Sequence, residues 1–82
     1  MYYVYLITSI KHPNQFYIGY TNDVQKRLIT HNHGGSPHTA KYKPWKLAVY
    51  LYFASKERAV KFEKYLKSQS GRAFLNKRFL SP

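Results

Sequence analysis

Hydrophobic and polar residues follow two periodicities along this chain. Three stretches rich in β-branched and aromatic residues predict strands, at residues 2–8, 15–21 and 47–53. Both faces of the first stretch are apolar, so we expect it to form a central strand covered on each side. Residues 11–14 have turn chemistry, which predicts an antiparallel hairpin between the first two strands.

A helical period follows the hairpin. A capping residue among positions 21–23 predicts a helix that ends at about His33, before two glycines. Residues 35–46 carry two prolines and several basic side chains, and are expected to form a loop.

A second helical segment follows the third predicted strand. Ser55 is expected to cap a helix through about Ser68, and Gly71 to interrupt the chain before a short basic helix at about 72–79. The predicted order is ββαβαα. It describes an α+β fold in which a small three-stranded antiparallel sheet is flanked by helices.

Composition narrows the class of protein. With 82 residues, the chain has room for one domain, predicted over 1–82. Lys and Arg total 14 against three acidic residues, a formal net charge of +11, which favours nucleic acid as the partner over an anionic membrane. No apolar run could span a bilayer, and neither cysteine nor signal-peptide character is present, so we expect a cytoplasmic protein without a membrane partner.

Candidate chemistry begins on the first predicted helix. Arg27 and His31 share one face with Val24 and Leu28, which places them against the sheet or its rim. An Arg whose stem packs while its head reaches water is the structural alternative. On the second helix, Glu63 falls within an apolar arc, where a carboxylate is either paired with a basic residue or binds a metal ion.

The strands contribute Tyr5, Tyr17 and Gly19, the last two on one strand face. Glycine within a strand often marks the close approach of a ligand or another backbone. Core packing is the alternative for the tyrosines, since the chain has nine. The spacing of His31, His33 and His38 follows no zinc-ligand pattern, so His33 and His38 are expected to be loop histidines.

These residues occur in an order that resembles the GIY-YIG nuclease superfamily, with similarity to the nuclease domain of the bacterial excision-repair endonuclease. Tyr3-Val4-Tyr5-Leu6-Ile7 resembles the GIY motif, and Tyr17-Ile18-Gly19 matches the YIG motif literally. The family's Arg, ten positions after the YIG tyrosine, corresponds to Arg27, and the His or Tyr four positions later to His31. The family's metal-binding Glu and later Asn correspond to Glu63 and Asn76.

The resemblance implies an endonuclease that hydrolyses phosphodiester bonds, in DNA more than RNA, with structure-led or weak sequence preference. It implies that Glu63 holds one Mg²⁺ or Mn²⁺, that Arg27 binds phosphate, and that Tyr17 is the general base. Tyr5 and His31 would orient water or phosphate, and His31 is the alternative base. Candidate backbone contacts are Gly19, Lys41, Lys43, Lys46, Arg72, Asn76, Lys77 and Arg78.

Two departures from the family accompany this resemblance. Tyr3 replaces the glycine of GIY, and Tyr20 replaces the lysine that follows YIG in the repair enzymes, so another group must contact phosphate if that lysine does. A non-catalytic nucleic-acid-binding module of the same fold and a small basic RNA-binding protein remain alternatives. A protein partner that supplies targeting is also expected, because the chain carries no added specificity domain.

Overall fold

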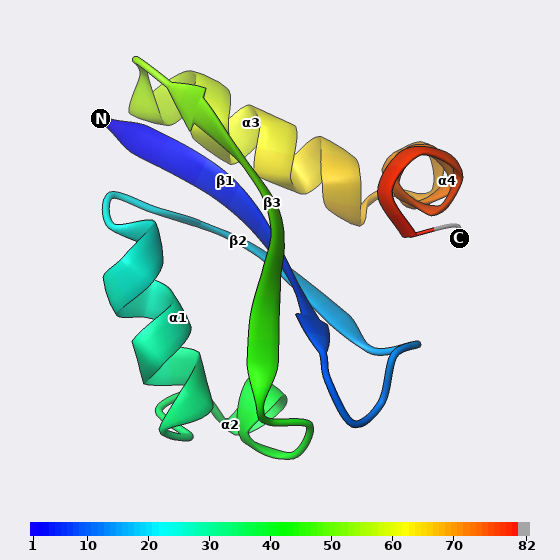
Figure 1. Cartoon of the computed structure of the whole chain (residues 1–82). Helices are drawn as coiled ribbons and strands as arrows, with labels where there is room; N and C mark the ends of the chain where they lie inside the picture. Colours follow the sequence, from blue (N-terminus) through cyan, green and yellow to red (C-terminus); the bar gives the residue numbers. More distant parts are fainter. Residues whose placement is uncertain (81–82) are drawn as a thin grey trace.

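The computed structural model describes residues 1–80 and contains a three-stranded sheet between two layers of helices (Figure 1). The last two residues of the predicted domain, Ser81 and Pro82, lie outside the described residues. Strands β1 (Tyr2–Ser9), β2 (Phe16–Thr21) and β3 (Trp45–Phe53) are antiparallel, in the order β2-β1-β3. The α+β class, the hairpin and the central first strand are confirmed.

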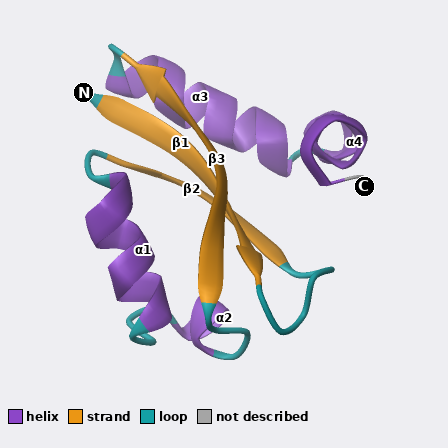
Figure 2. Ribbon diagram, viewed as in Figure 1, coloured by secondary structure: helices purple, strands orange, loops and turns teal. Residues whose placement is uncertain are grey.

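The helices flank the sheet on both faces (Figure 2). They are α1 (Val24–Asn32), α2 (Pro37–Ala40), α3 (Lys56–Lys67) and α4 (Gln69–Leu75), and a π-helical turn, η1 (Asn76–Leu80), ends the described chain. None of these helices is long and apolar enough to cross a membrane.

Alternation along β1 builds two apolar clusters, one on each face of the sheet. Val4 and Leu6 pack with residues of α3 and α4. Tyr5 and Ile7 point to the opposite face and pack with Trp45 and with Leu28 of α1. All four β1 side chains are buried, as expected of a central strand covered on each side.

Helix caps lie where the sequence predicts them. The carboxylate of Asp23 accepts from the Lys26 N–H at the start of α1, and the hydroxyl of Ser55 accepts from the Arg58 N–H at the start of α3. After α1, Gly34 adopts a φ of +77°, a conformation that glycine tolerates best.

Three boundaries differ from prediction. The segment expected to be a loop contains the short helix α2, which begins at Pro37, a residue suited to the first helical turn. Strand β3 begins at Trp45, two residues early. Gly71 does not interrupt the final helix: the break falls at Ser68, whose side chain caps α4. Gly71 lies within α4, and this position requires glycine because a Cβ there would overlap the Tyr65 carbonyl.

Candidate active site

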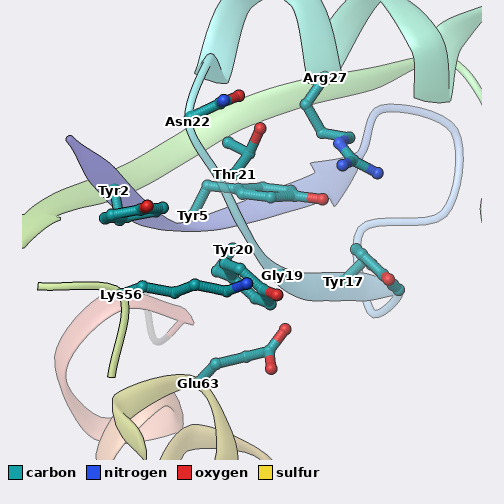
Figure 3. A pocket seen from close by; sticks show the side chains of 10 residues that line it. All are labelled: Tyr2, Tyr5, Tyr17, Gly19, Tyr20, Thr21, Asn22, Arg27, Lys56 and Glu63. Atoms are coloured by element: carbon teal, nitrogen blue, oxygen red, sulfur yellow. The ribbon is translucent and has the colours of Figure 1, made fainter. Parts of the chain in front are cut away.

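A cavity of about 530 Å³ opens at the free edge of β2. Because β2 is an edge strand, side chains from the helix layers on both faces of the sheet reach this cavity. In Figure 3, Arg27 approaches from α1 and Glu63 from α3, on opposite sides of β2, with Tyr5 and Tyr17 between them. The sequence separates these groups widely, and the sheet edge brings them together.

Gly19 lines the same cavity and faces Tyr5 across the β1–β2 pair. A Cβ at Gly19 would lie 2.5 Å from the Tyr5 hydroxyl oxygen and 2.8 Å from the ring carbon that carries it. The glycine predicted to mark a close approach therefore makes room for the ring of Tyr5.

Tyr5 is buried and hydrogen-bonded to a buried histidine. Its hydroxyl lies 2.8 Å from Nε2 of His31. Burial raises the pKa of Tyr5 well above its usual range, and electrostatic interactions with Tyr17 and Glu63 act in the same direction, against Arg27. Tyr5 therefore remains a neutral hydroxyl that positions other groups.

His31 lies beneath the cavity and does not line it. Its side chain is 1% exposed, and Nδ1 lies 2.7 Å from the hydroxyl of Thr39. That hydroxyl donates to the Ser36 carbonyl at 3.3 Å, so it accepts from Nδ1–H of His31. The Nε2 atom is then the acceptor for Tyr5, which assigns a neutral tautomer. Burial and the charge of Arg27 both lower the pKa of His31, in agreement with this neutral state.

Tyr17 is half-buried and lies at the centre of the site. Its ring centroid is 5.0 Å from that of His31 and 6.3 Å from that of Tyr5. The ammonium of Lys67 lies 5.7 Å from the same ring centroid. Tyr17 is thus a partly accessible phenol of the site, flanked by the positive charge of Lys67.

Glu63 is the acidic side chain of the cavity among residues 1–80. Its side chain is 15% exposed, and one carboxylate oxygen lies 3.5 Å from Nζ of Lys67. The interaction is long and Lys67 is largely exposed, so the carboxylate can accept another cation. No cluster of three or more metal-ligating side chains occurs in the described part of the chain.

The cavity contains a lysine that the sequence analysis missed. Lys56, the first residue of α3, lines it beside Tyr20, and Figure 3 shows its side chain extended into the site. Lys56 precedes Glu63 by two helical turns, so both lie on one helix face. That spacing was the available signal.

The predicted backbone contacts lie outside this cavity, apart from Gly19. Lys41, Lys43 and Lys46 are exposed around the loop between α2 and β3 and at the start of β3, and Asn76, Lys77 and Arg78 belong to η1. Arg72 of α4 stacks on Phe16, with its guanidinium carbon 5.6 Å from the ring centroid.

Comparison with known proteins gives related sequences and folds. Residues 1–78 match the GIY-YIG catalytic domain family. The chain is 42% identical over 69 residues to the structure-specific endonuclease subunit SLX1 of Debaryomyces hansenii, covering 76% of this chain and 20% of that protein. A similar subunit of Kluyveromyces lactis is 42% identical over 66 residues, covering 72% of this chain and 23% of that protein. The chain thus spans about a fifth of the length of these yeast relatives.

Small bacterial proteins match over more of their length. A UPF0213 protein of Streptococcus pyogenes is 38% identical over 72 residues, covering 87% of this chain and 76% of that protein. The solution structure of a UPF0213 protein from Bacillus halodurans superimposes with a TM-score of 0.56 at 31% identity, covering all of this chain and 89% of the other.

Proposed function

The chain belongs to the GIY-YIG family of nuclease catalytic domains, as its sequence predicted, and we propose that it is an endonuclease that hydrolyses phosphodiester bonds with one divalent metal ion. The observation that carries the proposal is the meeting of Tyr17, Arg27 and Glu63 in one open cavity. The yeast relatives are structure-specific endonuclease subunits, which supports a structured nucleic acid as the substrate, and we propose DNA rather than RNA.

The cavity suits a hydrated metal ion better than a fully protein-ligated one. Glu63 supplies a single carboxylate, and Mg²⁺ commonly binds one or two carboxylates together with waters and phosphate oxygens. Glu63 would hold Mg²⁺ or Mn²⁺, and the bound ion would stabilise negative charge on the phosphate and the leaving oxygen.

The chain's own side chains take the remaining roles. Arg27 offers a planar guanidinium that can contact two phosphate oxygens. Tyr17 takes the proton of the attacking water as general base. The hydroxyl of Tyr5 donates a hydrogen bond to His31. Its oxygen can therefore still accept a hydrogen bond from that water. His31 is a positioning residue, because both of its ring nitrogens are engaged.

Lys56 replaces the positive charge that this chain lacks at the position after YIG. Tyr20 occupies that position, and Lys56 reaches the cavity beside it from the start of α3. We assign Lys56 to the phosphate on the Glu63 side of the cavity, opposite Arg27 (Figure 3). The exposed basic residues on the α2–β3 loop, α4 and η1 would contact the substrate backbone farther away.

A non-catalytic nucleic-acid-binding module is the second candidate function, favoured by the charge of +11 alone. It gives no reason for a single carboxylate to line the cavity that Arg27 and Lys56 also line. Because the yeast relatives are named as subunits, a partner protein that supplies targeting is also proposed.

A cleavage screen over branched, flapped, bulged and linear DNA and RNA tests the function. Wild-type protein should cut at least one substrate when Mg²⁺ or Mn²⁺ is present and none in a chelator. Glu63→Gln should bind that substrate without cutting it. Glu57→Gln is the matched control, since Glu57 lies on the same helix with a solvent-exposed ion pair to Lys61.

The outcomes separate the candidates. Binding without cleavage by the wild type, with every substrate and both ions, would support the binding module. Cleavage by Glu63→Gln at the wild-type rate would remove Glu63 from the metal site and leave it as a structural partner of Lys67.

A further inference from the structure

A second cavity, of about 430 Å³, lies beside the active site. Its walls come from the start of β2, from α2 with the loop after it, and from the end of α3. Tyr17 lines both cavities, so the two adjoin at this side chain. A group bound in the second cavity would therefore lie next to the reacting phosphate.

The second cavity has aromatic walls that are held in place. Phe16 and Tyr42 are half-buried and both line it. The Arg72 guanidinium contacts the Phe16 ring, and the His12 ring meets Tyr42 edge-on, with centroids 5.3 Å apart. Rings supported in this way form surfaces against which a planar group can stack.

Trp45 adds a buried ring to the same cavity. Its exposure is 3%, and its indole N–H donates to the Thr39 carbonyl at 2.7 Å. Thr39 is also the hydroxyl that holds His31, so the cavity wall and the support of the active site share one residue.

Polar groups at the rim complete the cavity. The exposed side chains of Gln15 and His38 line it and supply both hydrogen-bond donors and acceptors. The ammonium of Lys67 also lines it, between the Glu63 carboxylate and the ring of Tyr17. The cavity thus combines aromatic surfaces for stacking, polar groups that can hydrogen-bond to the edge of a planar ligand, and a positive charge on the side of the active site.

We propose that this cavity binds an unpaired nucleobase adjoining the phosphodiester bond that is cut. The inference rests on the proposed nuclease function and specifies its substrate as a strand with an unpaired nucleotide next to the scissile bond. Aromatic rings stack on any base, so the cavity would select an unpaired state more than a sequence. A base inside a duplex cannot enter, because its faces and its pairing edge are already occupied.

Binding to three duplexes of equal length tests the proposal. One is fully paired, one carries a single-nucleotide bulge, and one carries the same bulge as an abasic residue. Measured in a chelator to prevent cleavage, the bulged duplex should bind wild-type protein about tenfold more tightly than the abasic one, the scale of one base–aromatic stack. His38→Ala and Tyr42→Leu should reduce that ratio, whereas His33→Ala, at an exposed position outside the cavity, should preserve it.

The outcomes distinguish this inference from the proposed function. Equal binding of bulged and abasic duplexes by the wild type would overturn the nucleobase site, while cleavage activity could remain intact. A ratio that survives both cavity variants would also overturn it. If Tyr42→Leu fails to fold, the binding ratio measured with His38→Ala still tests the proposal, because His38 is exposed. With metal ion added, cuts should map to the bond beside the bulge, and cuts elsewhere would contradict the placement. DNA and RNA versions of each duplex identify the strand chemistry.

Discussion

The hydroxyl of Tyr5 and Nε2 of His31 lie 2.8 Å apart in the buried layer beneath the candidate active site. The contact joins the central strand to α1 and engages the hydroxyl of Tyr5, whereas Tyr17 remains partly accessible. Because Thr39 engages the other ring nitrogen, protonation of His31 would break the arrangement on which Tyr5 depends.

The first prediction concerns stability against pH. The pKa of His31 is lowered in the folded state, so the unfolded chain binds its proton more readily. This contribution to stability is fully present above the unfolded pKa of about 6.5 and is lost as pH falls toward the lowered folded value. Denaturant unfolding between pH 7.5 and 5 should show stability decreasing by at most about 1.4 kcal/mol per pH unit from this residue.

His31→Gln should flatten that slope, because glutamine keeps a polar side chain without titrating in this range. His33→Gln, at an exposed position, should leave the slope as in the wild type. An unchanged slope in His31→Gln would mean that other groups govern the acid response.

Sequence patterns predicted the helix boundaries that depend on interactions between residues close in sequence. Asp23 and Ser55 cap helices because short polar side chains satisfy nearby N–H groups, which depends on neighbours in sequence. The interpretation of Gly71 was wrong because its reason is tertiary: α4 packs closely against the end of α3. Pro37 was assigned to a loop, although proline also begins helices.

The candidate active site was predictable only in part. The resemblance nominated Tyr17, Arg27 and Glu63, and helix periodicity placed the latter two on inward faces. Periodicity could not show that the two faces belong to opposite layers that meet around the free edge of β2. Lys56 was missed because the chain has many lysines. Lys56 stands out only once Glu63 is known to line the site, since the two share one face of α3.

Lys56→Met should weaken substrate binding and cleavage, because it removes a cation from the cavity. If Lys56 contacts phosphate, the slope of log affinity against log salt should become shallower by about one unit. Lys61→Met removes the same charge from the same helix outside the cavity and should act more weakly. Equal effects of the two variants would reduce Lys56 to general surface charge.

Arg27→Lys should lower cleavage by about 10²-fold or more, although it conserves charge, which is the scale for losing one preorganised electrostatic contact. A lysine ammonium cannot reproduce the planar fork of donors. Single-turnover cleavage at saturating protein separates this loss from weaker binding. Near-wild-type turnover would make Arg27 a generic basic contact. Lys26→Met, on an exposed neighbouring residue, serves as the control.

The last prediction concerns the base. Tyr17→Phe should reduce the cleavage rate by about 10²- to 10⁴-fold, the typical loss when a general base is removed. The ring contacts with Tyr5 and His31 remain, so stability and substrate binding should change little.

The pH profile distinguishes Tyr17 from its competitor. Tyrosine loses its proton in alkaline solution, so a working phenolate predicts a wild-type rate that climbs with pH above neutrality and a flat profile in Tyr17→Phe. A histidine base would give a rise at acidic pH, because burial and Arg27 lower the pKa of His31. Single-turnover rates of wild type, Tyr17→Phe and His31→Gln at saturating metal ion decide between them. An undiminished rate and an unchanged pH profile in Tyr17→Phe would show that Tyr17 is not the general base. The proton would then have to pass to His31, whose two nitrogens are already bonded, or to solvent at the metal ion.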